Sequence, residues 1–373
     1  MQSCEALIVG GGPAGSTCAR ALTRFGLDVV VIDKAGFPRD KVCAGWVTPP
    51  VLETLEIDVD DYRNGRVLQD ITGFRTGVIG GGSATTRYDG PVSFGIRRCE
   101  FDDFLLRRCG ARLRLGETVT TIERVADGWV VNGTLSTRIL VGAGGHFCPV
   151  ARLLGTNVGR AESTVVAQEM EFELDGAGPG DVEAGQPELY FCRDLSGYGW
   201  SFRKGTYLNV GLGRENGHGM SEAVREFWKW LEAQGKVPAG MAPRMKGHAY
   251  VLYGHASRPR VADRVVAIGD AAGLAYAQSG EGIRTAVESG VLAARAIVAA
   301  KGDYSRAALS RYEAAIEERF GRAAPSAASG QPPGRLRAAA GRWLLSRPWF
   351  VRRVVLDRWF LHAHVPALEV RAV

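Results

Sequence analysis

The sequence contains no apolar run that approaches the roughly 18 residues needed to cross a bilayer as a helix. Its start lacks a basic region followed by a long apolar stretch, so no secretory signal peptide is predicted. The seven cysteines are scattered, without a CxxC pair or a Cys-His cluster, and the histidines show no ligand spacing. These absences argue against a metal site and a disulfide framework, and they favour a cytoplasmic enzyme with reduced thiols.

Most of the chain also lacks net charge. Its 46 basic and 40 acidic residues give a formal charge of +6. Eight arginines lie between Gln331 and Val373, where the acids are Asp357 and Glu369, so the preceding residues are balanced. This distribution argues against a nucleic-acid partner, which is bound through a broad basic face. The same tail holds three of the eight tryptophans. Arginine and tryptophan on an apolar stretch indicate a membrane surface or a packed C-terminal helix.

The 373 residues suffice for about two domains. The clearest unit is a βαβ pattern at the start. The apolar run Ala6–Val9 predicts a buried parallel strand, and a helix ending near Phe25 follows it. Val29–Ile32 predicts the next strand, which Asp33 closes. Between the first strand and the helix, Gly10–Gly15 carries the GxGxxG spacing of a dinucleotide-binding turn.

Each part of this turn has a physical role. The first glycine permits a tight turn, the second lets the backbone approach a pyrophosphate, and the third lets helix and strand pack closely. The free amides of the helix N-terminus attract phosphate, and the acid after the second strand is placed to bond a ribose hydroxyl. The expected cofactor-binding residues of this unit are Gly10, Gly12, Pro13, Ala14, Gly15, Asp33 and Lys34.

A second strand-Gly-Asp-helix pattern lies far downstream and favours a flavin over a nicotinamide dinucleotide. The strand Val265–Ile268 runs into a Gly-Asp pair whose acid can bond a ribitol hydroxyl. A helix from Ile283 to Ala300, with a narrow buried face, follows the Gly-Glu-Gly turn, whose amides can stabilise negative charge on a reduced flavin ring. The expected flavin-binding residues are Gly269, Asp270, Gly280, Gly282 and Ile283.

The middle of the chain has a different pattern, which predicts an antiparallel sheet with one solvated face. The expected strands are Thr164–Leu174, Glu188–Cys192, Gly197–Phe202 and Tyr207–Leu212. A helix capped by Ser221 is expected to follow and to end at Gly235.

Five blocks in order carry a family resemblance: GGGPAGSTCARAL, RDKVCAGWVTP, RRCEFDDFLL, GYGWSFRKGTYLNVGLG and GDAAGLAYAQSGEGIRTAVESG. Over residues 4–320 the chain resembles the FAD-dependent oxidoreductases of the para-hydroxybenzoate hydroxylase fold, in their geranylgeranyl-reductase-like branch. The resemblance implies an α/β fold: a Rossmann-like FAD-binding domain, a parallel sheet with helices, interleaved with an antiparallel-sheet substrate domain, plus a C-terminal helical tail. The expected division is 1–75, 93–158 and 255–322 for the discontinuous FAD-binding domain, 76–92 and 159–254 for the substrate domain, and 323–373 for a linker and basic helical segment.

The resemblance also implies site residues. Arg98 matches an arginine near the ribityl-diphosphate chain of FAD. Cys43, the candidate catalytic residue, matches a cysteine near the flavin and the reacting double bond, where it either donates a proton or only shapes the pocket. The aromatic residues expected to hold the substrate, with ordinary core packing as the alternative, are Trp46, Tyr198, Trp200 and Phe202.

Three departures from the family pattern leave parts of the function open. The segment 141–146 (VGAGGH) lacks the acid that relatives associate with FAD and pyridine nucleotide, so the electron donor is NADPH or another reductant. Ala44 and Arg203 stand where the reductases usually have glycine and proline. These two changes leave the substrate open.

The predicted function is reduction of carbon-carbon double bonds in an apolar, isoprenoid or lipid-like substrate by hydride transfer from reduced FAD. The alternative on the same fold is a monooxygenase that hydroxylates an aromatic or other small hydrophobic substrate; a halogenase is disfavoured because its WxWxIP block is missing. A third hypothesis is a membrane-surface or nucleic-acid-binding protein with a vestigial nucleotide fold. The expected partners are a hydrophobic small molecule and, through the basic tail, the periphery of a membrane, with no nucleic acid.

Overall fold

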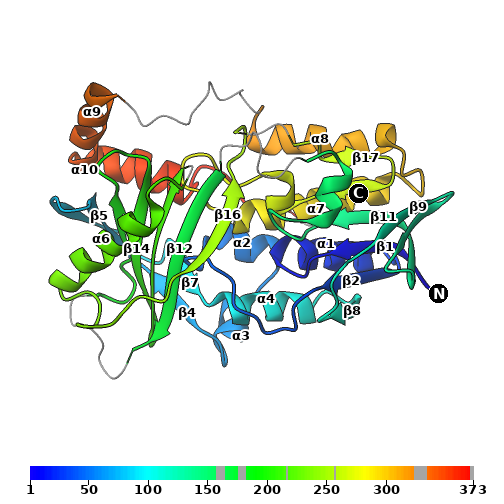
Figure 1. Cartoon of the computed structure of the whole chain (residues 1–373), viewed down its shortest axis with the longest axis horizontal. Coiled ribbons are helices and arrows are strands. Elements are labelled where there is room, and N and C mark those ends of the chain that lie inside the picture. Colours follow the sequence, from blue (N-terminus) through cyan, green and yellow to red (C-terminus); the bar gives the residue numbers. More distant parts are fainter. Residues whose placement is uncertain (157–163, 175–181, 216, 256–257, 323–333, 370–373) are drawn as a thin grey trace.

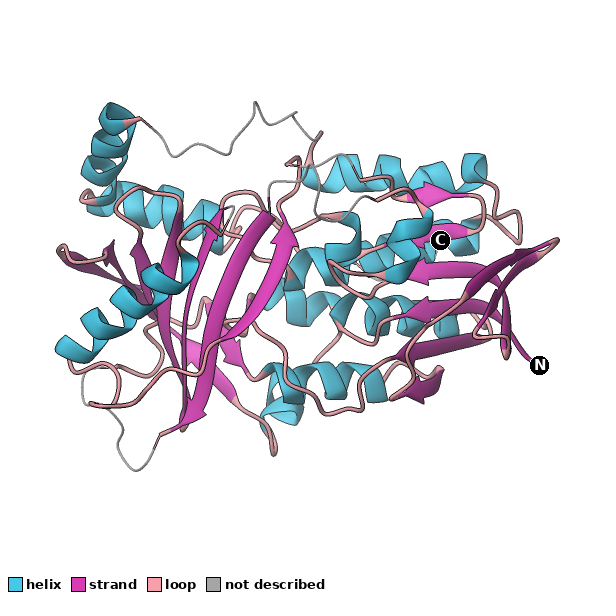
Figure 2. Ribbon diagram, viewed as in Figure 1, coloured by secondary structure: helices cyan, strands magenta, loops and turns pink. Residues whose placement is uncertain are grey.

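The computed structural model describes residues 1–156, 164–174, 182–215, 217–255, 258–322 and 334–369 (Figure 1). Two large sheets lie at opposite ends of the long axis. One is mainly parallel and packs with helices, and the other is mainly antiparallel (Figure 2).

The parallel sheet has the strand order β17-β18-β11-β1-β2-β8, and β10 and β9 extend it from β11. The pairs between β18 and β8 along this order are parallel. Its strands are β1 (Gln2–Val9), β2 (Val29–Asp33), β8 (Arg112–Leu115), β9 (Ile122–Val125), β10 (Gly128–Val131), β11 (Leu135–Gly142), β17 (Val261–Ala262) and β18 (Val265–Ala267). Burial of the central strands explains their uninterrupted apolar runs.

Helices α1 (Pro13–Arg24) and α7 (Ile283–Ala299) pack closely against each other. A Cβ atom at Gly290 would lie 2.6 Å from the carbonyl oxygen of Ala14, so this contact requires glycine. The prediction that α7 has a narrow buried face is wrong. The helix is buried on nearly all sides, because α8 and α2 pack against its other faces. The remaining helices around this sheet are α2 (Pro49–Thr54), α3 (Val59–Arg63), α4 (Arg98–Arg107), α5 (Pro149–Leu153), η1 (Gly269–Ala272) and α8 (Arg306–Phe320).

The second large sheet has the order β16-β12-β15-β14-β13-β5-β6, and only its β13–β5 pair is parallel. Its strands are β5 (Gly73–Val78), β6 (Ser83–Arg87), β12 (Thr164–Glu173), β13 (Glu188–Phe191), β14 (Gly197–Lys204), β15 (Tyr207–Glu215) and β16 (Lys246–Val251). Helix α6 (Met220–Ala233) covers one face. A small antiparallel sheet adjoins it, with β3 (Trp46–Val47), β7 (Ser93–Ile96) and β4 (Leu68–Ile71).

The strands predicted in the middle of the chain are present with small differences at their ends. β14 and β15 run beyond their predicted last residues, to Lys204 and Glu215. The predicted N-cap Ser221 is wrong: α6 begins at Met220 after Gly219, whose left-handed backbone turns the chain into the helix.

The C-terminal segment (residues 334–369) is helical over much of its length, as predicted. It contains α9 (Arg335–Leu345), α10 (Pro348–Phe350) and the helical stretch η2 (Val351–Phe360). In Figure 1, α9 and α10 lie beside the antiparallel sheet, at the end of the molecule opposite β1. The sequence predicts a linker over Ala323–Gly334, of which residues 323–333 lie outside the described residues. None of the helices described here is both long and apolar enough to span a membrane.

Candidate active site

A cavity of about 860 Å³ lies where the two large sheets meet. Residues that end or follow β1, β2 and β11 line one side of it, and side chains of β12, β13, β14 and β16 line the other. Open α/β sheets bind ligands at the carboxyl ends of their strands, as here. The structure brings every predicted site residue into this lining except Gly15 and Gly269.

The glycine turn forms the nucleotide end of the cavity. Gly10 has φ +115°, and a Cβ atom there would lie 2.4 Å from the carbonyl oxygen of Ala143. A Cβ atom at Gly15 would lie 1.9 Å from the carbonyl oxygen of Gly10, which leaves no room for any other residue. Gly12 precedes α1 and no side chain caps the helix amides. These uncapped amides face a cavity that fits a diphosphate. We call Gly10–Gly15 the glycine cradle.

Asp33, at the end of β2, fixes the turn beside the cradle. Its Oδ2 accepts a hydrogen bond from the Gly11 amide at 2.7 Å, and its Oδ1 accepts one from the Ala35 amide at 2.9 Å. Residues 117–119 line the same end, although the sequence did not single them out. They follow β8, which is the parallel neighbour of β2, and only the strand order reveals that proximity.

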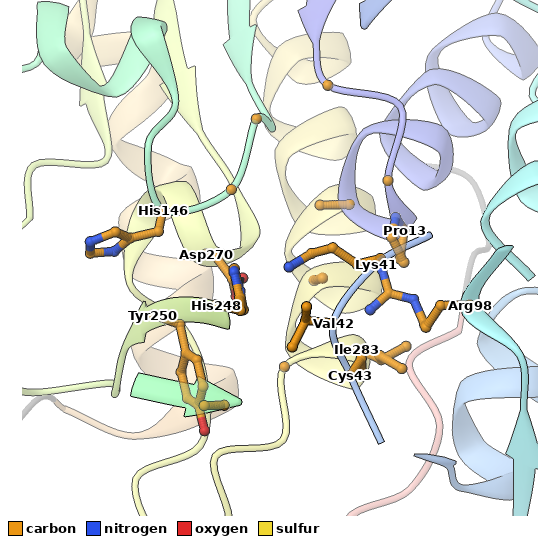
Figure 3. A pocket seen from close by; sticks show the side chains of 18 of the residues that line it. Pro13, Lys41, Val42, Cys43, Arg98, His146, His248, Tyr250, Asp270 and Ile283 are labelled. Carbon is orange, nitrogen blue, oxygen red and sulfur yellow. Dashed lines mark hydrogen bonds and ion pairs between the residues drawn. The ribbon is translucent and has the colours of Figure 1, made fainter. Parts of the chain in front are cut away.

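Several basic side chains line the cavity near the cradle, among them Arg98 and Lys41 (Figure 3). Arg98 is held by Asp102, whose two oxygens accept hydrogen bonds from its Nε and Nη2 at 2.8 Å each. Lys41, which sequence reasoning missed, takes part in none of the ion pairs of the described residues. Burial lowers the pKa of Lys41 to about 8, and the nearby charge of Asp270 opposes that change. A negatively charged ligand such as the diphosphate of FAD fits this pair of cations.

Asp270 of the downstream Gly-Asp pair lines the cavity, whereas Gly269 packs behind the lining against Ala14. Gly269 has φ +60°, and its amide donates a hydrogen bond to Ser289 Oγ at 3.0 Å. His248 Nε2 lies 3.4 Å from Asp270 Oδ2. Burial alone would raise the pKa of Asp270, but His248, Lys41 and Arg98 together hold that pKa below its usual value. An ionised Asp270 is a strong hydrogen-bond acceptor for a hydroxyl of a ribityl chain.

Two glutamates line the cavity, Glu169 buried and Glu281 half-buried, and desolvation raises the pKa of each carboxyl group to about 7. Glu281 lies in the Gly-Glu-Gly turn, where its Oε1 accepts a hydrogen bond from the Arg284 amide at 2.7 Å. Glu169 lies on β12 and was not singled out by the sequence analysis. The sequence does contain a pattern that could have revealed Glu169. Glutamates occur at every second position, 169, 171 and 173, of a predicted strand, which places their three carboxylates on one face of the sheet.

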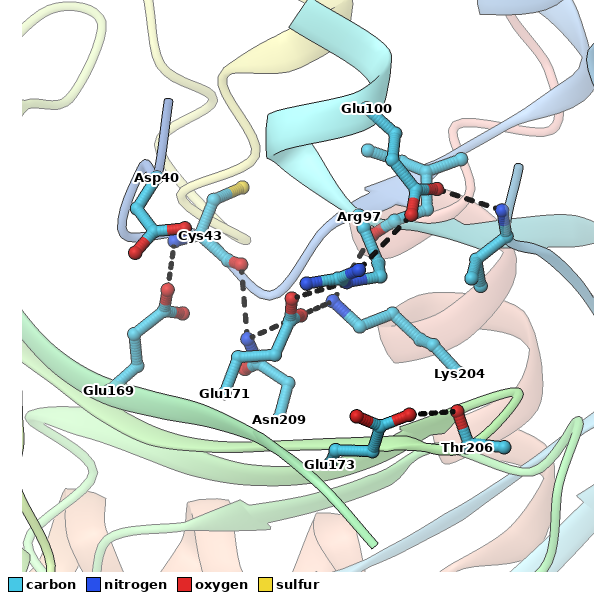
Figure 4. Close-up of polar contacts among 12 residues, drawn as sticks. Asp40, Cys43, Arg97, Glu100, Glu169, Glu171, Glu173, Lys204, Thr206 and Asn209 are labelled. Atoms are coloured by element: carbon cyan, nitrogen blue, oxygen red, sulfur yellow. Dashed lines mark hydrogen bonds and ion pairs between the residues drawn. The ribbon is translucent and has the colours of Figure 1, made fainter. Parts of the chain in front are cut away.

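The segment with Cys43 rests on polar side chains of the antiparallel sheet (Figure 4). The Cys43 amide donates a hydrogen bond to Glu169 Oε1 at 2.6 Å. The Cys43 carbonyl oxygen accepts one from Asn209 Nδ2 at 3.4 Å. Lys204 is fully buried, and its Nζ donates to the Ala44 carbonyl at 3.0 Å. The Gly45 amide donates to Cys43 Sγ at 3.4 Å. The sheet therefore fixes where the thiol stands in the cavity.

The four predicted aromatic residues gather at the other end of the cavity. Trp200 and Phe202 are also buried in a core cluster, so the packing role and the lining role coexist. Trp200 Nε1 donates a hydrogen bond to Asn209 Oδ1 at 2.7 Å. Tyr198 Oη donates to the carbonyl of Ser279 at 2.5 Å, which ties β14 to the Gly-Glu-Gly turn.

Histidines do not form a metal centre in the described parts of the chain. His146 is buried and lies 3.1 Å from Arg258 through its Nδ1. Nowhere among the described residues do three His, Cys, Asp or Glu side chains converge in a way that could hold a metal ion.

Comparison with known proteins extends these observations. The profile of an NAD(P)-binding Rossmann-like domain matches residues 8–39. The menaquinone reductase of Mycobacterium tuberculosis is 31% identical over 321 residues, covering 78% of this chain and 76% of that protein. Digeranylgeranylglycerophospholipid reductase 2 of Methanosphaera stadtmanae is 26% identical over 346 residues, covering 86% of this chain and 85% of that protein.

Among solved structures, a geranylgeranyl bacteriochlorophyll reductase-like protein of Thermoplasma acidophilum has the same fold, with a TM-score of 0.74 at 22% identity. The match covers 92% of this chain and 88% of that one. The predicted fold class, a Rossmann-like unit combined with an antiparallel sheet and a helical tail, is confirmed.

Proposed function

The chain belongs to the geranylgeranyl-reductase family of FAD-dependent oxidoreductases, and we propose that it saturates carbon-carbon double bonds of an isoprenoid chain. The observation that carries this proposal is the shared cavity. The glycine cradle and basic side chains line one end, aromatic side chains line the other, and the segment with Lys41, Val42 and Cys43 crosses between them (Figure 3). An extended apolar substrate fits the aromatic end beside a cofactor that occupies the rest.

The residues of the cavity fit FAD. The uncapped amides of α1, together with Arg98 and Lys41, suit the diphosphate, and Asp33 and Asp270 suit hydroxyls of the ribose and ribityl groups. The N-terminal end of α7, which begins after Gly282, carries the positive end of the helix dipole and suits a ring that gains negative charge. When bound, reduced FAD supplies the hydride. NADPH is the first external donor to test, and dithionite is the comparison, because the segment 141–146 (VGAGGH) lacks the acid that relatives associate with pyridine nucleotide.

The protein's own part is to hold the alkene, exclude water and supply a proton. Trp46, Tyr198 and Trp200 would hold the chain by apolar contact. We assign the proton to Cys43 Sγ, because the sheet fixes this segment and the Gly45 amide donates a hydrogen bond toward the sulfur, which stabilises the thiolate left behind. Closure by aromatic side chains keeps the reacting carbon dry while positive charge develops on it.

The test is anaerobic turnover of the holoenzyme with NADPH or dithionite and a geranylgeranyl substrate, with products identified by mass spectrometry. The proposal predicts products that gain two hydrogen atoms for each double bond. Cys43→Ser should lower kcat while the protein keeps its bound flavin. Oxygen uptake coupled to formation of a hydroxylated product would instead establish the monooxygenase alternative.

We further propose that the protein is cytoplasmic and that its C-terminal segment contacts a membrane through its outer side. Leu336, Trp343 and Trp349 of this segment are exposed and stand among arginines. Exposed apolar groups beside cations suit an anionic lipid surface. Sedimentation with vesicles containing phosphatidylglycerol tests this contact, and double substitution of the two tryptophans by alanine should weaken it while flavin is retained.

The domain division is also a proposal. The strands β1, β2, β8, β11 and β18 pair in one sheet, which supports one discontinuous unit. The strands β12, β13, β14, β15 and β16 pair in another sheet, which supports a second unit. The proposed ranges are 1–75, 93–158 and 255–322 for the FAD-binding domain, 76–92 and 159–254 for the substrate domain, and 323–373 for the linker and tail.

A further inference from the structure

The C-terminal segment packs its apolar side onto the protein's own antiparallel sheet. Val351, Val355 and Leu356 of η2 are fully or almost fully buried, in one cluster with Phe74 and Trp200. This cluster lies on the sheet face opposite α6, whose apolar residues pack into a different cluster. A membrane therefore has no access to this side of η2.

The last residue of η2 reaches the cavity itself. Phe360 is 4% exposed and lines the aromatic end. Its ring stacks on Trp46, with centroids 5.6 Å apart, and meets the ring of Tyr198 edge-on at 5.3 Å. Trp46 also stacks on Phe74 at 5.0 Å, so it is clamped between a sheet residue and a tail residue. A side chain from the end of the sequence thus forms part of the cavity wall.

Hydrogen bonds hold η2 in place on the side of the antiparallel sheet. Tyr88 Oη donates to Asp357 Oδ1 at 2.7 Å, and the guanidinium of Arg352 lies 4.9 Å from the centre of the Tyr88 ring. These contacts fix the helical stretch that presents Phe360 to the cavity.

The chain beyond η2 is tied to the FAD-binding side. Arg284 Nη2 donates to the carbonyls of Val365 and Pro366 at 2.8 and 2.9 Å. Glu288, almost fully buried, pairs with both Arg284 and Arg319, and Arg319 also donates to the Pro366 carbonyl. With anchors before and after it, Phe360 cannot move away from Trp46 without breaking a buried network.

We propose that Phe360 closes the substrate end of the cavity and sets the longest isoprenoid chain that the enzyme accepts. This inference rests on the proposed function and deepens it. Removing the ring extends the cavity toward η2, where its neighbours are apolar side chains. Such a space accepts additional isoprene carbons and stays dry. A pocket residue that stops a chain discriminates sharply, because a longer chain must displace packed atoms.

The test measures binding of prenyl alcohols of increasing length, geraniol, farnesol, geranylgeraniol and solanesol, to the oxidised holoenzyme by titration calorimetry. Phe360→Ala is the main variant. Phe360→Leu removes fewer atoms and replaces it in the test if Phe360→Ala does not fold. Trp349→Ala is the matched control, because this aromatic belongs to the same segment and is 60% exposed.

In a Phe360 variant, the Kd for a longer alcohol should decrease about tenfold relative to the Kd for a shorter one, which is the scale on which pockets discriminate added carbons. In Trp349→Ala this ratio of Kd values should not change. Unchanged length preference in folded, flavin-loaded Phe360 variants would overturn the inference while leaving the proposed function standing. Failure of the wild-type protein to bind any of these alcohols would instead overturn the proposed function, and the inference with it.

Discussion

The glycine cradle and the C-terminal segment both border the same cavity, yet they are built in opposite ways. The cradle is six consecutive residues whose shape depends on missing side chains, since a Cβ at Gly10 or Gly15 would overlap backbone atoms. The C-terminal segment depends on large side chains that pack on the distant antiparallel sheet, and on Arg284 and Arg319, which donate hydrogen bonds to its carbonyl groups. Backbone geometry therefore defines the nucleotide end, whereas side-chain packing across the molecule defines the substrate end.

The strongest test of this contrast is a single methyl group in the cradle. Gly15→Ala places a Cβ atom 1.9 Å from the Gly10 carbonyl oxygen, so strand and helix must separate. We expect loss of bound flavin, together with about 3 kcal/mol of stability, a cost typical of overpacking. The ratio of flavin absorbance to protein absorbance measures the first effect.

Gly36→Ala is the matched control, because a Cβ atom there would meet nothing within 4 Å. It should keep a full complement of flavin. Flavin retained at the wild-type ratio by Gly15→Ala would show that the turn tolerates a side chain and that the cradle is not built as described.

The next effect concerns the anchor of the C-terminal segment. Glu288→Ala leaves Arg284 and Arg319 without their buried partner, which costs about 3–5 kcal/mol in comparable ion clusters. Denaturant unfolding of the holoenzyme measures this loss. Glu313, an acid of α8, provides a control substitution to alanine outside the cluster. A loss below about 1 kcal/mol, typical of a surface pair, would mean that the anchor is not needed.

The smallest effect arises between the two regions, at Glu169. Its folded pKa of about 7 is above the ordinary value of 4.5, because burial favours the protonated acid. The protonated carboxyl group of Glu169 therefore contributes its full share to the stability of the folded protein below pH 4.5, and this contribution is lost as the pH rises through about 7. Glu169→Gln keeps an acceptor for the Cys43 amide but cannot titrate. The difference in Tm, wild type minus Glu169→Gln, should therefore decrease as the pH is raised from 4.5 to about 7.

Glu173→Gln serves as the comparison, since Glu173 shares the strand face but is exposed. A Tm difference between wild type and Glu169→Gln that rises with pH, or stays flat, would contradict the assignment of a protonated Glu169.

The sequence was sufficient for the cradle and for the Gly-Asp turn because their chemistry is local. Strand, glycines, helix and acid follow one another within one unit, and each part has a recognisable pattern. The aromatic residues of β14 could be predicted for a related reason: alternation puts them on one face without knowledge of the rest of the sheet.

Other parts of the site could not be predicted because they depend on which distant segments meet. Residues 117–119 reach the cavity only through the pairing of β2 with β8. Glu169 becomes significant only when β12 lies under the Cys43 segment. The arginines and tryptophans of the tail indicated either a lipid surface or packing; Phe360, whose ring meets Trp46 and Tyr198, belongs to the packed side.

The most direct test of the central claim is an anaerobic single turnover. The holoenzyme, reduced with dithionite and freed of excess reductant, is mixed with an excess of a geranylgeranyl substrate, and saturated product is counted against bound FAD. The account predicts one saturated double bond for each reduced FAD, with the flavin returned to its oxidised spectrum before any oxygen is admitted. A flavin that stays reduced until oxygen enters, followed by a hydroxylated product, would contradict it.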